Sequence, residues 1–155
     1  MKPLVVLLVA FALIGGGTWL LAGQPNFRWA GNGAMVVMLL FTAVGHFAFT
    51  PGMMQMLPEW LPFRRGWVYL TGVLELAAAA GLLWPAARPS TAWALLAFFA
   101  AILPANVHAA RIGLDYQTGQ LTGPGPRYLW FRVPLQLLFM AWTWYFGLHL
   151  GSLSR

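Results

Sequence analysis

The 155-residue sequence is 60% hydrophobic and only 8% charged, whereas a soluble domain of this length carries about 25% charged residues. Its net charge of +6 comes from basic residues that stand mostly singly at the ends of apolar stretches, so no basic face for nucleic acid is expected. Cysteine is absent, which excludes iron–sulfur ligands and a thiol–disulfide relay from this chain's own side chains. The composition predicts one membrane domain over residues 1–155.

Five apolar stretches follow one another along the chain, and each reaches or approaches the ~20 residues that cross ~30 Å of hydrocarbon as a helix. None alternates with the two-residue period of a β-barrel strand. The sequence therefore predicts an all-α polytopic membrane protein, a four-helix transmembrane bundle with one extra N-terminal transmembrane helix. The predicted spans are residues 4–21, 33–57, 67–84, 92–110 and 128–150.

The first stretch, residues 4–21, follows a positive charge at Lys2, as the apolar run of a signal peptide does. Its apolar run is longer than the usual 7–15 residues of a signal peptide, and no clean small-x-small cleavage site follows it. We therefore expect this stretch to be retained as a helix.

Basic residues near the ends of the spans predict the orientation. With the N-terminus in the cytoplasm, the cytoplasmic set is Lys2, Arg64, Arg65, Arg111, Arg127 and Arg132, and the external set is Arg28, Arg88 and Arg155. This excess predicts a multi-pass protein of the cytoplasmic (inner) membrane with an external C-terminus. The one long polar connection, residues 111–127, is rich in Gly and Pro, which predicts irregular structure.

Polar residues inside the apolar stretches carry the functional signal. Glu75 is the most informative, because a carboxylate ~12 Å inside its span is costly without a partner or a task. At ~1.5 Å of rise per residue, five polar side chains on four spans fall in the cytoplasmic half of the bilayer. Their shared depth predicts one interior cluster that opens toward the cytoplasm. Its members are His46, Glu75, Asn106, Arg132 and Gln136.

Three further residues are secondary candidates. Thr42 and Thr71 each stand four residues before a member of the cluster and share its helix face. His108 lies near the interface and points roughly 200° away from Asn106 on a regular helix. The histidines and Glu75 lack the i, i+3 or i, i+4 spacing of paired ligands, so we expect neither a metal nor a haem site.

Each member of the cluster also has a purely structural interpretation. Arg132 can snorkel to the interface, the two amides can join helices, and His46 can bond a backbone carbonyl as a neutral core histidine. A buried carboxylate needs a proton or a cation. Glu75 is therefore either ion-paired with Arg132 or part of a functional site.

Five short motifs in order resemble the DoxX family of small integral membrane proteins. They are Gly45-His46-Phe47, Leu57-Pro58-x-x-Leu61-Pro62, VYLTGVLE at 68–75, Pro104-Ala105-Asn106 and Arg132-Val133-Pro134-Leu135-Gln136. The resemblance implies a four-helix core, placed at residues 33–150, and makes 4–21 an additional helix. The motifs contain the same five residues that the depth argument selects.

Members of the DoxX family are associated with thiosulfate and quinone oxidoreduction or with oxidative stress, and distant animal relatives resemble receptor-assembly chaperones. The resemblance implies a redox-associated membrane subunit, accessory to an oxidoreductase rather than active alone. Its polar pocket would bind a quinone-like or small oxyanionic molecule. Arg132 would hold the anionic oxygen while Glu75 and His46 exchange protons.

Two other functional classes stay open. The first is a membrane assembly or partner-binding protein whose polar cluster only locks the bundle. The second is a small-molecule transporter, for which the sequence offers no internal repeat. Quinone is the one candidate cofactor, and no catalytic residue is assigned. The expected partners are the lipid bilayer and a membrane or redox protein, with homo-oligomerisation left open.

Overall fold

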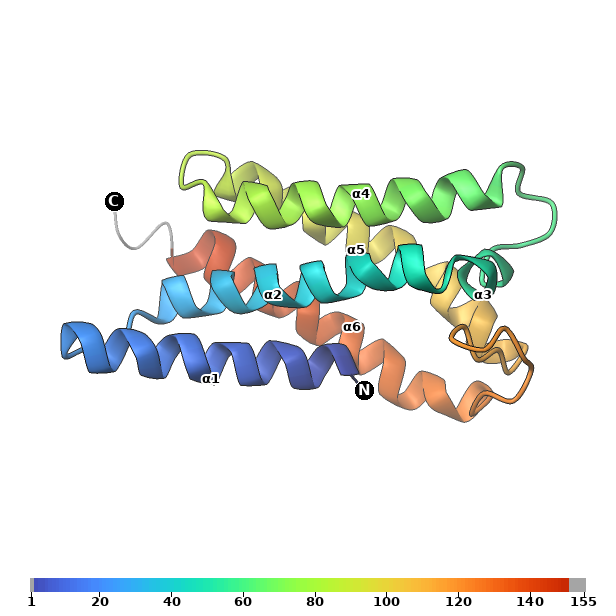
Figure 1. Ribbon diagram of the computed structural model, residues 1–155, viewed down its shortest axis with the longest axis horizontal. Coiled ribbons are helices and arrows are strands. Elements are labelled where there is room, and N and C mark those ends of the chain that lie inside the picture. The colour runs from blue at the N-terminus through green and yellow to red at the C-terminus, as the bar shows by residue number, and fades with distance from the viewer. Residues whose placement is uncertain (1, 151–155) are drawn as a thin grey trace.

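The computed structural model describes residues 2–150, which are helical throughout apart from the connections between helices and hold no strand. The elements are α1 (Lys2–Ala22), α2 (Phe27–Ala48), α3 (Thr50–Gln55), α4 (Arg64–Leu83), α5 (Arg88–Arg111), η1 (Pro126–Tyr128), α6 (Leu129–Thr143) and η2 (Trp144–His149). The longer helices run along the long axis of the molecule, with α1, α2 and α4 in front of α5 and α6 in Figure 1. Arg155 of the orientation count lies outside the described residues.

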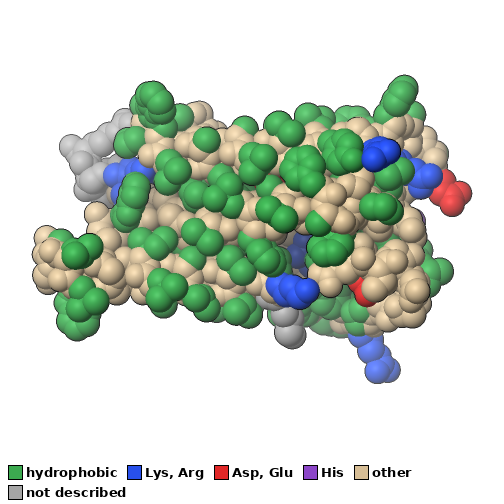
Figure 2. Space-filling model, in the orientation of Figure 1, with side chains coloured by type: hydrophobic (Ala, Val, Ile, Leu, Met, Phe, Trp, Pro, Cys, Tyr) green, Lys and Arg blue, Asp and Glu red, His purple; other side chains and the backbone are tan. Residues whose placement is uncertain are grey.

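Four helices, α1, α2, α4 and α5, are long and apolar enough to cross a membrane. The fifth, α6, has 15 residues and continues directly into the six-residue π-helical turn η2. Large hydrophobic side chains are exposed along these helices, including Leu13 at 70%, Leu20 at 83% and Val44 at 65%. Figure 2 shows such side chains spread along this face, with the visible acidic side chains near one end. An apolar surface of this extent is unusual for a soluble monomer and suits a membrane protein.

α1 packs against the bundle through buried apolar side chains. Leu7 is fully buried, and the ring of Phe11 meets that of Trp142 edge-on with 5.0 Å between centroids. The helix is displaced along the axis relative to α2 and α4, so that its first turn lies beside the middle of the bundle (Figure 1). This displacement places Pro3 next to the polar residues described below.

The predicted span 33–57 is wrong at both ends. α2 begins at Phe27 because the side chain of Asn26 caps it, accepting a hydrogen bond from the Trp29 N–H. It ends at Ala48, and Pro51 stands at the start of the separate helix α3, a position where its missing N–H costs no helical hydrogen bond. His46 therefore lies in the last turn of α2, and no single helix joins it to residue 57.

The connection between α5 and η1 folds back on α3. It contains no helix and is closed by an isolated bridge between Asp115 and Gln120. The ring of Tyr116 meets that of Phe49 with centroids 6.2 Å apart, and its carbonyl lies where a side chain at Gly52 would project. The connection thus covers the end of the bundle at which α3 lies.

Candidate functional site

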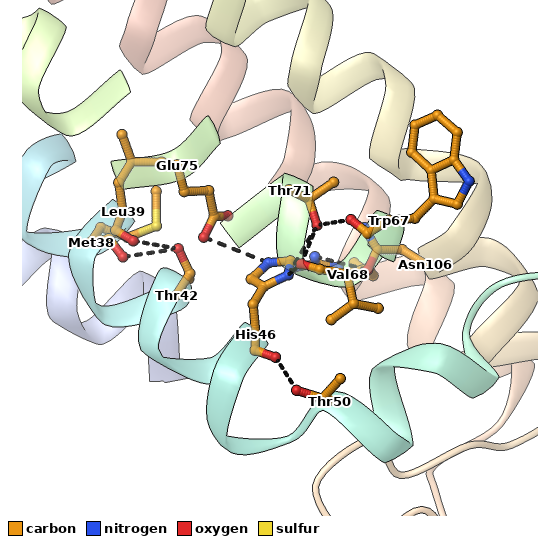
Figure 3. A network of polar contacts seen from close by, with 11 residues as sticks. Met38, Leu39, Thr42, His46, Thr50, Trp67, Val68, Thr71, Glu75 and Asn106 are labelled. Carbon is orange, nitrogen blue, oxygen red and sulfur yellow. Dashed lines mark hydrogen bonds and ion pairs between the residues drawn. The ribbon is translucent and has the colours of Figure 1, made fainter. Parts of the chain in front are cut away.

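The predicted polar residues meet where α2 and α4 approach closely. A Cβ on Gly72 would lie 2.9 Å from the Cβ of His46, so the bare glycine backbone permits this approach. Glu75 stands on α4 one turn later and is only 5% exposed. Figure 3 shows His46 reaching from α2 toward the Glu75 carboxylate on one side and toward Thr71 on the other.

A partly open cavity of ≈ 50 Å³ lies beside Glu75, lined by side chains of α1, α2, α4, α5 and α6. Its polar lining consists of Thr42, Glu75, Arg132 and Gln136, and its apolar lining consists of Pro3, Met38, Phe99, Ile102 and Phe139. The surface in Figure 2 is hollowed near the start of α1. One water needs roughly 10–15 Å³ by this kind of measure, so the cavity has room for a few water-sized groups.

The carboxylate of Glu75 is incompletely satisfied. Its Oε2 is buried and accepts no hydrogen bond from any of residues 2–150. The nearest cationic candidate is Nε2 of His46 at 3.6 Å, which is longer than the ~2.7–3.2 Å of a hydrogen bond. Arg132 lies within ion-pair distance of no carboxylate in the described chain. The ion pair with Arg132, one of the two interpretations of Glu75, is therefore not formed, and of the predicted contacts with Arg132, Gln136 or His46 the structure shows the one with His46.

The other ring nitrogen of His46 is held by α4. Nδ1 lies 3.0 Å from the Val68 carbonyl oxygen and 3.0 Å from the Thr71 hydroxyl. A carbonyl only accepts, so the Val68 contact is a hydrogen bond in the tautomer that carries a proton on Nδ1. The Thr71 hydroxyl lies 2.9 Å from the same carbonyl and 3.0 Å from that of Trp67, and either carbonyl can accept its one proton. This arrangement turns Nε2 toward Glu75.

The amides and the arginine join α5 to α6. Nη2 of Arg132 donates to Oδ1 of Asn106 at 3.0 Å, and Asn106 donates to the Ile102 carbonyl at 3.1 Å. Nε2 of Gln136 donates to the Phe99 carbonyl at 2.8 Å. These bonds fix the guanidinium at the wall of the cavity.

Six of the eight predicted residues, the five cluster members and Thr42, thus line the cavity or contact one of its lining residues, and Thr71 joins them through His46. Thr42, Glu75, Arg132 and Gln136 line it, while His46, Asn106 and Thr71 stand behind that lining. His108 does not line it, in agreement with its predicted direction away from buried Asn106. Residues 2–150 contain no group of three His, Cys, Asp or Glu side chains placed to hold a metal ion.

The contribution of α1 was not foreseen in the sequence. Pro3 lines the cavity because α1 is displaced along the bundle axis, and no residue pattern in 4–21 predicts this displacement. The aromatic lining residues Phe99 and Phe139 carry the ordinary signal of apolar helix positions, which does not distinguish a cavity wall from a packed core.

Comparison with known families matches residues 35–147 to the family described as Domain of unknown function (DUF8561). No curated protein and no solved structure gives a significant match. The matched region begins within α2, leaves α1 outside and contains every residue of the predicted cluster. The resemblance to the DoxX family stays a prediction. Because the match covers most of its length, the chain belongs to the DUF8561 family.

Proposed function

We propose that this chain is a multi-pass protein of the cytoplasmic membrane that binds a small oxyanion in its polar cavity, as a subunit associated with a redox enzyme. The observation that carries the proposal is Arg132, a partly buried guanidinium that lines the cavity and has no carboxylate within ion-pair distance in residues 2–150. A buried group left unsatisfied costs about 1–3 kcal/mol, and more when charged. Such a cost is typical of a site that is completed by a ligand.

The transmembrane arrangement is supported by helix direction and charge. The starts of α1, α4 and α6 lie at or toward the same end as the last turns of α2 and α5, so the helices alternate in direction. Five of the six basic residues of the cytoplasmic set lie at helix ends or in the connections on this side, and the sixth, Arg132, lines the cavity. This arrangement supports the proposal that α6 with η2 is the fifth span, that the N-terminus is cytoplasmic and that the cavity lies toward the cytoplasmic side.

The chemistry of the cavity supports an anionic ligand. Arg132 has five N–H donors in a planar fork, and within the described chain it donates one hydrogen bond, to Asn106. The remaining donors are available to the oxygens of a planar or tetrahedral anion. A volume of ≈ 50 Å³ favours a small oxyanion over a quinone ring, since drug-sized ligands occupy pockets of about 300–1,000 Å³. The redox association rests on the DoxX resemblance alone.

A structural role for the cluster is the second candidate function. The Arg132–Asn106 bond and the bond from Gln136 to the Phe99 carbonyl both cross between α5 and α6, as locking contacts would. An assembly or partner-binding protein needs no more than these contacts. It gives no reason for an arginine that lines a cavity and uses one of its five donors, which is why binding is preferred.

Anion titration of the full chain in lipid nanodiscs tests the proposal. Calorimetry with formate, nitrite and thiosulfate is expected to show saturable binding of at least one anion. Arg132→Gln is expected to weaken that binding at least tenfold, or ~1.4 kcal/mol. Arg111→Gln is the matched control, because Arg111 is exposed near the same end of the bundle. Absence of binding, or equal affinity in the Arg132 variant, would contradict the proposal. Mass spectrometry of small molecules that co-purify with the protein would identify the natural ligand.

A further inference from the structure

The space between His46 and Glu75 holds a position for one proton. Nδ1 of His46 keeps its own proton for the Val68 carbonyl, so Nε2 is the nitrogen that faces Oε2 of Glu75 at 3.6 Å. Without a proton on either atom, a lone pair and a carboxylate oxygen would face each other in a buried place. A single proton removes this conflict, either as imidazolium beside carboxylate or as neutral imidazole beside carboxylic acid.

Arg132 is the one fixed charge that lines the cavity in residues 2–150. The other groups near the cavity and the His46–Glu75 pair are uncharged. They are Pro3 on α1, Thr42 on α2, Thr71 on α4, Asn106 on α5 and Gln136 on α6. Lys2 lies outside the lining and is exposed, donating to the side chain of Gln117. The charge state of the pair therefore depends chiefly on Arg132 and on whatever binds to it.

We propose that binding of an oxyanion to Arg132 is coupled to uptake of one proton by the His46–Glu75 pair. This inference rests on the proposed function and deepens it. With the cavity free of anion, the pair holds no proton on Nε2 or Oε2 and carries one negative charge. A bound anion compensates Arg132 itself, and an unprotonated pair would then add a second negative charge beside it.

The uptake is balanced in charge and atoms. One anion and one proton enter together, so the net charge of the site does not change. The proton leaves a hydronium ion or a buffer acid, which becomes water or the conjugate base, and forms a bond to Nε2 or Oε2. His46 is the more accessible member of the pair, with 17% of its side chain exposed against 6% for Glu75.

Calorimetry of formate and nitrite binding to the full chain in nanodiscs, in buffers of different ionisation enthalpy, counts the protons taken up. We expect about one proton per anion and, above neutral pH, a Kd that weakens up to about tenfold per pH unit. Glu75→Gln is expected to take up no proton and to bind with an affinity that no longer depends on pH. Glu59→Gln and Asp115→Asn are controls that should behave as the natural sequence does, and they complete the set of three acidic residues.

The outcomes separate this inference from the proposed function. Anion binding without proton uptake, or uptake that persists in Glu75→Gln, would overturn the coupling and leave anion binding in place. Failure of both anions to bind at every pH would overturn the two together. The number of protons that the natural sequence takes up per bound anion tests the coupling by itself, even if the Glu75 variant does not fold.

Discussion

Nε2 of His46 lies 3.6 Å from Oε2 of Glu75 across the contact between α2 and α4, and that oxygen has no hydrogen-bond partner within residues 2–150. The pair joins the last turn of α2 to the middle of α4. Two local features position the pair: the absence of a side chain at Gly72 and the contact between Nδ1 of His46 and the Val68 carbonyl oxygen. Each of these features can be tested separately.

The first prediction concerns the proton on Nδ1. Because the Val68 carbonyl only accepts, His46 should carry a proton on Nδ1 whether or not Nε2 is also protonated. Nitrogen NMR of histidine-labelled protein in nanodiscs would show this, with only three histidines to resolve. The signal of His46 is the one lost in His46→Asn. A neutral ring with its single proton on Nε2 would contradict the geometry.

The second prediction concerns the α2–α4 approach. In Gly72→Ala the new Cβ would lie 2.9 Å from the Cβ of His46, so the two helices must separate. Overpacking of this kind costs about 1–3 kcal/mol, against roughly 1 kcal/mol gained in helix propensity. We expect a lower Tm in detergent and a changed NMR signal for His46.

Gly66→Ala on the same helix is the matched control. The nearest heavy atom to its new Cβ, in the side chain of Phe63, would be 3.9 Å away, an ordinary contact. Its Tm should stay equal or rise. Equal behaviour of the two variants would show that the approach at Gly72 is not tight in the protein.

The third prediction concerns orientation. The chain has no cysteine, so single cysteines report their side of the membrane without background. Ala86→Cys, in the exposed connection between α4 and α5, should react in intact cells with a maleimide that cannot cross the membrane. Thr122→Cys, exposed in the connection after α5, should react only after permeabilisation. The reverse pattern would place the N-terminus outside.

The residues of the polar cluster could be predicted from the sequence because the bilayer makes polar side chains rare and costly. Depth along four helices was enough to group His46, Glu75, Asn106, Arg132 and Gln136. Their partners could not be predicted in the same way. Which group faces Glu75 depends on the rotation of each helix and on how closely α2 and α4 approach at Gly72. The periodicity of residues along the sequence predicts neither.

The predicted ends of the span 33–57 were wrong because a capping residue and a proline determine where α2 and α3 begin. The polar cap at Asn26 lies before the apolar run, and Pro51 is compatible with either a kink or a new start. The axial displacement of α1, which brings Pro3 to the cavity, depends on packing against several helices at once.

The last prediction separates the two candidate functions by stability. Arg132 donates a hydrogen bond to Oδ1 of Asn106, whereas Oε2 of Glu75 accepts no hydrogen bond within residues 2–150. A buried polar group without a hydrogen bond costs about 1–3 kcal/mol, and more when charged, and an apolar side chain of similar size removes that cost. Glu75→Leu should therefore melt at the same or a higher temperature and lose proton-coupled anion binding.

Gln136→Leu is the comparison, because it removes a bond that is made, the one to the Phe99 carbonyl at 2.8 Å. It leaves a buried acceptor without its donor and should lose about 1–3 kcal/mol. If the cluster only locked the bundle, Glu75→Leu would instead leave Arg132 uncompensated and cost about 3–5 kcal/mol. Thermal melts of both variants in the same detergent decide between these results. A Glu75→Leu protein that melts below Gln136→Leu would favour the structural lock over a binding site.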